Sequence, residues 1–166
     1  MSEAMKLVAF VGSLRQGSFN RMALHAFVER LPAGVSVQEI EIGDWPLYNF
    51  DIQAKGFPGN VEAAQKTMLA ADGIVLVTPE YNYGVSGVLK NAIDWLSRTT
   101  PQPFAAKPIA IFGASGGLLG TARAMVRLSV RRSCPTSGAP MFDTAAIQSS
   151  SARSSLAISC TRWPSL

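Results

Sequence analysis

An almost wholly apolar run over residues 6–11 ends at Gly12 and is followed at once by a loop rich in hydroxyl and amide side chains. A continuous apolar run of this length is typical of a parallel strand that is covered on both faces. Beyond the loop, apolar residues recur at helical spacing from Met22 onward, and Ser18 or Asn20 is available as the N-cap. The sequence therefore predicts a buried strand, a loop and a helix that begins at the loop.

The loop has the chemistry of an anion site. Backbone N–H groups at the start of a helix and the positive end of the helix dipole both favour a bound anion. Arg15 adds a planar cation suited to phosphate oxygens, and Ser13, Ser18 and Asn20 add side-chain donors. Neither the Gly-Lys-Ser/Thr ending of a P-loop nor the G-x-G-x-x-G of dinucleotide folds is present. The pattern favours a terminal phosphate monoester, although the loop alone is equally compatible with a Gly/Ser turn that carries a surface Arg.

Strands and helices are expected to alternate along the next part of the chain. Residues 74–77 and 108–112 form further apolar runs, and 35–42 alternates partly, as an edge strand does. Helical spacing recurs over 58–71 and 89–96. This order predicts an α/β fold built on a doubly wound parallel sheet with right-handed crossovers.

Three unusual loops, 12–20, 79–87 and 113–120, each follow the carboxyl end of an expected buried strand. In an open parallel sheet these ends meet at one edge, where the strand order reverses and ligands bind. The second loop carries two Tyr and an Asn that suit one side of a flat ring, and the third offers Ser and Gly main chain to the other side. A planar heteroaromatic ring with one phosphate on a flexible arm describes flavin mononucleotide (FMN).

Two alternatives remain open for the second loop. Tyr81 and Tyr83 could simply pack against the helix that follows. Glu80 could be a solvated loop acid, or the partner of an Arg across a subunit boundary.

Composition and charge exclude several other classes. With 166 residues and 48% apolar content, the chain is expected to form one domain, residues 1–166. The net charge is +4, but six of the 15 basic residues and one of the 11 acids lie after Ala122, so no nucleic-acid partner is expected. No apolar run approaches the roughly 20 residues of a membrane helix, and the N-terminus lacks a signal-peptide pattern. A cytoplasmic protein without a membrane partner is therefore expected.

The cysteine and histidine content predicts no metal site. Cys134 and Cys160 have no cluster of His nearby and make neither a disulfide framework nor a zinc site. The single histidine, His25, lies in the first helical pattern, and no hydrolytic nucleophile motif accompanies it. If a flavin is bound, it supplies the redox chemistry itself.

Three stretches are distinctive in combination: 12–20 (GSLRQGSFN), 79–83 (PEYNY) and 89–96 (LKNAIDWL). Over about residues 5 to 123 the chain closely resembles the NADPH-dependent FMN reductase family, especially its quinone and chromate reductase branch. The resemblance implies a flavodoxin-like, three-layer α/β/α fold with tightly held FMN. It also implies two hydride transfers, from NAD(P)H to the flavin and from the flavin to a quinone, chromate or a similar small acceptor. No catalytic side chain is expected, because the flavin carries the chemistry.

The resemblance also assigns residues to the site. The FMN phosphate would be bound by Ser13, Arg15, Ser18 and Asn20. The isoalloxazine ring would be bordered by Pro79, Glu80, Tyr81 and Asn82, and contacted from the third loop by Ser115 and Gly116. Interface positions in a homodimer or homotetramer would be taken by Tyr83 and Arg123.

From about residue 124 the chain departs from the family pattern. The segment 124–166 has no Lys, one acid and abundant Ser and Arg, and no convincing buried strand is predicted there. We expect one edge of the sheet to be poorly covered as a result, and we interpret the segment as a frameshifted or otherwise altered C-terminus. Two further interpretations stay open: a flavodoxin-type electron carrier without NAD(P)H oxidation of its own, and an inactive remnant.

Overall fold

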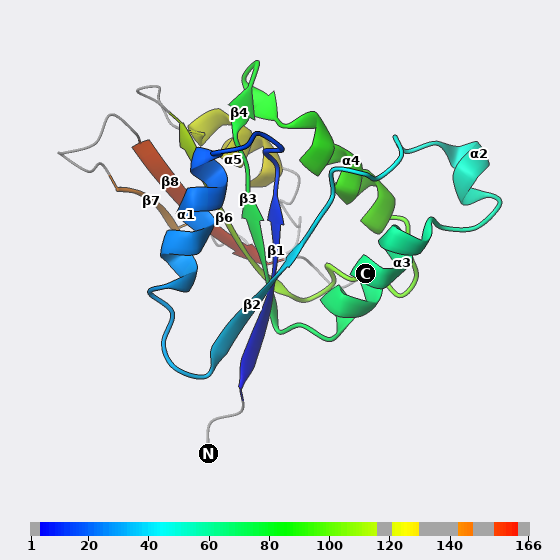
Figure 1. The fold of residues 1–166 in the computed structure, drawn as a ribbon, viewed down its shortest axis with the longest axis horizontal. Helices are drawn as coiled ribbons and strands as arrows, with labels where there is room; N and C mark the ends of the chain where they lie inside the picture. Colours follow the sequence, from blue (N-terminus) through cyan, green and yellow to red (C-terminus); the bar gives the residue numbers. More distant parts are fainter. Residues whose placement is uncertain (1–3, 116–120, 130–142, 148–154, 163–166) are drawn as a thin grey trace, which may run out of the picture.

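The structure is a computed structural model that describes residues 4–115, 121–129, 143–147 and 155–162. Figure 1 shows the course of the chain. The elements are, in order, β1 (Met5–Val11), α1 (Phe19–Val28), β2 (Val35–Ile40), α2 (Phe50–Gln53), α3 (Gly59–Leu69), β3 (Gly73–Val77), β4 (Glu80–Tyr81), β5 (Gly84–Val85), α4 (Gly87–Leu96), β6 (Pro108–Ser115), α5 (Ala122–Ser129), β7 (Asp143–Ile147) and β8 (Ser155–Arg162).

One six-stranded sheet in the order β2-β1-β3-β6-β8-β7 organises the fold. The neighbours β2, β1, β3 and β6 are parallel. From β1 the chain moves outward to β2 and then returns to β3 on the other side, so the switch point lies between β1 and β3. The predicted α/β fold with a doubly wound parallel sheet is confirmed for these four strands, and β2 is the edge strand that was expected.

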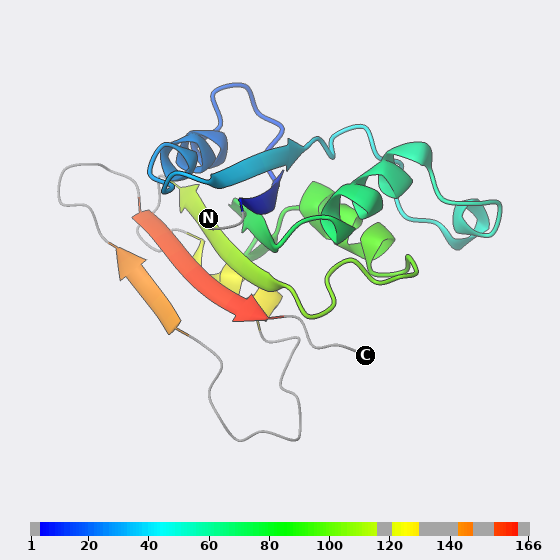
Figure 2. The ribbon, with the colours of Figure 1, turned by 90° about the horizontal axis from the view of Figure 1, so that it is seen from below.

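Both faces of the parallel strands are covered by helices. Along β1, Ala9 and Val11 pack with Leu24 of α1, whereas Val8 and Phe10 belong to the core cluster that includes α3 and α4. Figure 2 shows α1 on one side of the sheet and α3 and α4 on the other. Because successive strand residues point to opposite faces, a strand between two helical layers needs an apolar residue at every position. This explains the unbroken apolar runs in the sequence.

The sheet is not parallel throughout. β8 pairs antiparallel with all eight residues of β6, and β7 pairs antiparallel with β8. The expectation that this edge of the sheet is poorly covered is therefore wrong, since β8 pairs along the whole of β6. The sequence does carry a strand pattern for β8, since Leu156, Ile158 and Cys160 alternate with small or polar residues. The Ser-rich composition concealed it, and backbone hydrogen bonds to β6 do not depend on that composition.

Near the β2 edge, Arg21 of α1 binds two carboxylates. Its guanidinium nitrogens lie 3.0 Å from a Glu39 oxygen and 3.2 Å from a Glu41 oxygen. Burial raises the pKa of the Glu39 carboxyl above its usual value, although the charge of Arg21 opposes this shift. The Glu41 hydrogen bond is the largest cause that raises the pKa of Arg21.

The raised pKa predicts how stability depends on pH. The folded protein holds the Glu39 proton more tightly than the unfolded chain, so stability is lost as the pH rises through the folded pKa. We therefore expect the unfolding free energy of Glu39→Gln, relative to the unchanged protein, to increase from about pH 4 to about pH 7. Urea denaturation at several pH values measures this difference. A decrease over the same range would show that the attraction of Arg21 outweighs burial.

Candidate functional site

The ends of β1, β3 and β6 lie side by side at the carboxyl edge of the sheet. Just beyond β1, the Gly12 N–H donates to the Val77 carbonyl oxygen at 2.7 Å. Just beyond β3, the Thr78 N–H donates to the Phe112 carbonyl oxygen at 2.9 Å. These bonds continue the parallel ladders into the loops. The predicted meeting of these three strand ends at one edge of the sheet is therefore confirmed.

The second loop approaches the first so closely that Gly12 has no room for a side chain. A Cβ there would lie less than 3.0 Å from the Ser86 hydroxyl oxygen and 3.2 Å from Pro79 Cδ. Ser86 is the N-cap residue of α4 and is 1% exposed. Among the described residues its hydroxyl has no hydrogen-bond partner. The first loop and the start of α4 are thus packed directly against each other.

This contact can be tested with a double-mutant cycle. We expect Gly12→Ala to lower the unfolding free energy by about 2 kcal/mol through overpacking. Ser86→Ala is expected to be neutral or stabilising, because it removes a buried hydroxyl without a partner. The double variant should lose less than the sum of the single changes, as measured by urea denaturation. Strictly additive effects would show that the two residues do not meet.

Three polar side chains of the first loop are nearly buried. Ser13, Ser18 and Asn20 are 5%, 4% and 4% exposed. The Ser18 hydroxyl oxygen accepts from the Arg21 N–H at 3.3 Å and caps α1. Of the two N-caps considered from the sequence, Ser18 is the one used. The same hydroxyl keeps its own hydrogen available for donation.

Arg15 provides a cation at the mouth of this loop. Its side chain is exposed, and its guanidinium carbon lies 5.7 Å from the centre of the Phe19 ring. In the described part of the chain, none of the ion pairs involves Arg15. α1 also has no acid in its first turn. The positive end of the helix and the guanidinium therefore remain available to one anion.

Asn20 joins the first loop to the third. Its amide nitrogen donates to the Ala114 carbonyl oxygen at 3.1 Å, and its amide oxygen accepts from the Ala114 N–H at 3.0 Å. This pair of bonds holds the start of α1 against the end of β6, 94 residues away. Both the nitrogen and the oxygen of the Asn20 amide bond to Ala114. We therefore interpret Asn20 as a residue that holds the first loop in position against the third. A contact of Asn20 with phosphate stays a prediction.

The second loop contains a β-hairpin that was not predicted. β4 and β5 pair antiparallel across Asn82 and Tyr83, whose φ angles are 50° and 60°. Positive φ at both central residues is the signature of a type I′ turn, for which Asn-Gly is the usual signal. Asn-Tyr lacks that signal. Tyr81 and Tyr83 are 54% and 62% exposed, so the alternative that they pack against the following helix is not what the structure shows.

Glu80 caps a helix that lies far from it in sequence. One carboxylate oxygen accepts from the Arg123 N–H at 2.9 Å and from the Ala124 N–H at 3.0 Å. These donors belong to the first turn of α5, where unsatisfied N–H groups and the helix dipole favour a carboxylate. Glu80 is therefore not a fully solvated acid, and among the described residues no ion pair joins it to an Arg side chain. An Arg partner across a subunit boundary stays a prediction. No local pattern could have predicted a bond across 43 residues.

The third loop is described only in part. Ser115 ends β6 and is half-buried, whereas Gly116 lies outside the described residues. Across the described ranges, His, Cys, Asp and Glu do not gather into a group of three or more that could hold a metal ion. Nor is any helix there long and apolar enough to cross a membrane.

Comparison with known proteins identifies the family of this chain. The family model for NADPH-dependent FMN reductase matches residues 5–142. The chain belongs to this family. As an FMN reductase family member it is an oxidoreductase, with FMN and NAD(P)H as its cofactors.

Individual relatives agree with the family. An NAD(P)H-dependent FMN reductase of Pseudomonas aeruginosa is 50% identical over 128 residues, 77% of this chain and 69% of that protein. A quinone reductase of Escherichia coli K12 is 49% identical over 130 residues, with the same two coverages of 77% and 69%. The structure of FerB, a flavoenzyme NAD(P)H:(acceptor) oxidoreductase of Paracoccus denitrificans, matches with a TM-score of 0.71 at 34% identity. That match covers 76% of this chain and 70% of FerB, and it confirms the predicted flavodoxin-like fold.

The residues present in this FMN reductase family member suit FMN. The first loop offers a helix N-terminus, two nearly buried hydroxyls and a guanidinium without a carboxylate partner in the described chain. Such donors match a phosphate dianion. The second loop offers an exposed tyrosine ring and exposed main chain beside it, which suit a flat ring system.

Proposed function

We propose that the chain transfers hydride from NAD(P)H through FMN to a quinone or a similar small acceptor, chromate included. The observation that carries this proposal is the junction of the three loops, in which Gly12 packs on Ser86 and Asn20 is bonded to Ala114. FMN, when bound, supplies the hydride chemistry through its ring. The protein supplies binding, orientation and electrostatics.

At the phosphate end we assign Ser13, Ser18 and Arg15 as the binding side chains, together with the main chain of the loop. The Ser18 hydroxyl accepts from the Arg21 N–H and can donate its hydrogen to a phosphate oxygen at the same time. Asn20 acts beside them as a positioning residue.

At the ring end we assign Pro79, Tyr81, Asn82, Ser115 and Gly116. Glu80 lies in the same loop, and its cap on α5 holds the hairpin in place. No side chain is required as an acid or base, since the proposed reaction moves a hydride to and from the flavin.

The direct test uses the purified full chain under anaerobic conditions. We expect flavin absorbance bands, bleaching of those bands on addition of NADPH, and their return on addition of a quinone. A bound flavin that neither NADPH nor NADH bleaches would favour the electron-carrier alternative. A protein that rejects added FMN would favour the inactive remnant.

The role of Arg15 can be measured in the same preparation. Arg15→Gln removes one charge-assisted contact to phosphate, so we expect the Kd for FMN to rise about tenfold. The Kd for riboflavin, which lacks the phosphate, should not change. Arg30→Gln is the matched control, because the Arg30 guanidinium donates to the Ala26 carbonyl oxygen of α1 and, among the described residues, takes part in no ion pair. An equal loss for FMN and riboflavin would contradict a phosphate contact.

The assembly and cellular location of the protein are also proposals. We propose a homodimer or homotetramer with Tyr83 and Arg123 near a subunit boundary, and a cytoplasmic protein. Light scattering of the purified chain tests the first, and cell fractionation tests the second.

A further inference from the structure

Glu80 places a carboxylate at the junction of the second loop and α5. One of its oxygens accepts from the main-chain N–H groups of Arg123 and Ala124, at 2.9 Å and 3.0 Å. The residue is half-buried, so salt screens its charge less than that of a fully exposed acid. Among the described residues, no Lys or Arg forms an ion pair with it. The carboxylate therefore serves as a helix cap and keeps its negative charge.

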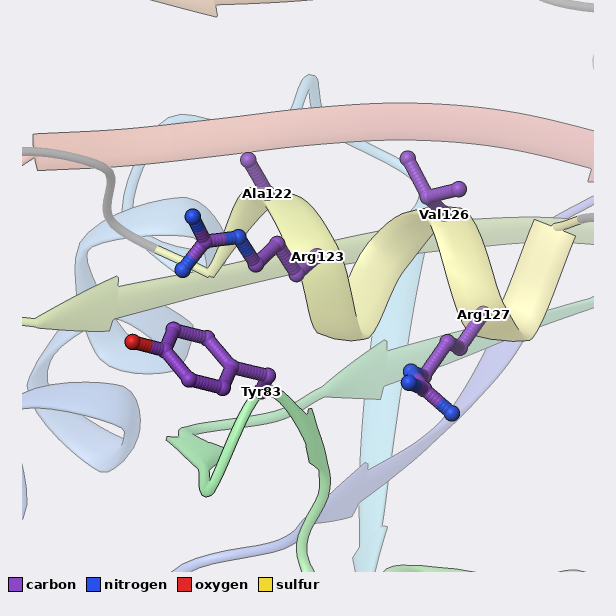
Figure 3. Close-up of a pocket in the computed structure, with 5 residues that line it drawn as sticks. All are labelled: Tyr83, Ala122, Arg123, Val126 and Arg127. Carbon is purple, nitrogen blue, oxygen red and sulfur yellow. The ribbon is translucent and has the colours of Figure 1, made fainter.

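The Arg123 side chain is turned to an aromatic ring instead. Its guanidinium carbon lies 4.2 Å from the centre of the Tyr83 ring, and Figure 3 shows the guanidinium above that ring. The first turn of α5 contributes only about half a positive charge, which a carboxylate more than cancels. Removing the charge of Glu80 would leave the helix end and the guanidinium in place, so the junction would become more positive.

The carboxylate is also close to the proposed ring end of the FMN site. Glu80 and Tyr81 are neighbours in β4, and successive side chains of a strand point to opposite sides. The Glu80 side chain faces α5, which leaves the other side of β4 and the exposed Tyr81 to the ring. Neighbouring Cα atoms are about 3.8 Å apart. A ring that lies on the main chain of this loop is therefore within about one Debye length, roughly 10 Å, of the carboxylate.

Hydride transfer changes the charge beside this carboxylate. A hydride brings two electrons and one proton from NAD(P)H, which becomes NAD(P)⁺, and adds one negative charge to the flavin ring. When the hydride passes on, the quinone that accepts it takes one further proton from water and becomes a hydroquinone. A fixed negative charge nearby disfavours the reduced ring and favours the departure of the hydride.

We infer that the Glu80 carboxylate lowers the reduction potential of the bound flavin and thereby suits the protein to quinones of low potential, such as naphthoquinones. This inference rests on the proposed function, which places the flavin ring beside the second loop, and extends it to the choice of acceptor. The two bonds to α5 hold the charge in one position.

The test measures the reduction potential of FMN bound to the full chain. Glu80→Gln removes the charge and keeps an oxygen that can accept from α5. Asp72→Asn is the matched control, because the Asp72 carboxylate also accepts from a main-chain N–H, that of Lys6 at 2.7 Å. Asp72 directly precedes β3, at the end of that strand opposite to the second loop. Both variants lose one negative charge.

The flavin is reduced chemically with dithionite beside a reference dye, and its absorbance reports the potential. Two unit charges about 10 Å apart at an effective dielectric constant of about 20 change an equilibrium roughly tenfold. We therefore expect Glu80→Gln to raise the potential by about 30 mV, which is tenfold for a two-electron couple. Asp72→Asn should leave it unchanged. Glu80→Asp, which keeps the charge, should stay close to the unchanged protein.

Several outcomes would overturn the inference. An unchanged potential in Glu80→Gln would do so, and a change of oligomeric state in the same variant would then identify an Arg of a second copy as the partner of Glu80. Equal shifts in Glu80→Gln and Glu80→Asp would assign the effect to the geometry of the cap, and equal shifts in Glu80→Gln and Asp72→Asn to net charge. Loss of FMN by Glu80→Gln would show that Glu80 acts only on the structure of the loop.

A kinetic measurement tests the choice of acceptor. In Glu80→Gln the ratio of kcat/KM for 1,4-naphthoquinone to kcat/KM for 1,4-benzoquinone should fall, because a higher flavin potential weakens the driving force for the acceptor that is harder to reduce. An unchanged ratio would overturn this part of the inference. Chemical reduction needs no NAD(P)H. Expected potentials in a protein that neither NADPH nor NADH bleaches would therefore overturn the proposed function and leave the role of Glu80 intact.

Discussion

Replacing Gly113 by alanine is expected to lower the unfolding free energy by about 3 kcal/mol or more. Gly113 lies near the end of β6, where an added Cβ would come closer than 3.0 Å to the Thr78 carbonyl oxygen and would lie 2.8 Å from Thr121 side-chain atoms. The carbonyl is main chain at the end of β3, so it cannot rotate away as a flexible side chain would. A loss of this size is a large fraction of the stability of an ordinary domain. Urea denaturation followed by circular dichroism measures it.

Gly59→Ala is the matched control for this prediction. Gly59 begins α3, and a methyl group added there would meet no heavy atom within 4 Å. We expect this variant to be as stable as the unchanged protein or slightly more stable, because alanine favours a helix. Equal stability of the two variants would contradict the close approach of Thr78 to β6.

Asn20→Ala is expected to have the second largest effect, on stability and on cofactor binding together. The change leaves the N–H and carbonyl oxygen of Ala114 without their side-chain partner. Leaving two such groups unsatisfied costs about 2–4 kcal/mol. Since the bonds hold the first loop against the third, we expect the Kd for flavin to rise at least about tenfold. Denaturation and flavin titration measure the two effects.

The comparison of FMN with riboflavin separates two roles for Asn20. If Asn20 is a positioning residue, Asn20→Ala should raise the Kd for FMN and the Kd for riboflavin by the same factor, because both ligands need the loops in place. If Asn20 only contacts phosphate, Asn20→Ala should raise the Kd for FMN and leave the Kd for riboflavin unchanged. That outcome would contradict the positioning role. Asn60→Ala on α3 is the control, since the Asn60 side-chain oxygen accepts from the neighbouring Val61 N–H and joins no distant segment among the described residues.

Much of the fold was predictable from contiguous patterns. The apolar runs at 6–11 and 74–77 became β1 and β3, because strands covered on both faces must be apolar at each position. Ser18 was recognisable as a cap because the bond it makes reaches only Arg21. The strand β8 carried an alternating signal that the surrounding Ser-rich composition concealed.

The conformation of the second loop was harder to predict from the sequence. Its turn uses Asn82 and Tyr83 at positive φ without the glycine that normally marks such a hairpin. The exposure of Tyr81 also could not be read from its neighbours, since tyrosine is common both in cores and at sites.

The amino-acid sequence was enough to predict the four parallel strands, the helices α1, α3 and α4, and the sheet edge at which three of those strands end. These features follow from residues that are close in the chain, where periodicity and capping act. Which residues would join the loops that follow those strands depended on the tertiary structure. Gly12 against Ser86, Asn20 on Ala114 and Glu80 on α5 are contacts between residues far apart in sequence. Only the path of the whole chain brings such partners within hydrogen-bond or van der Waals distance, so no local pattern encodes them.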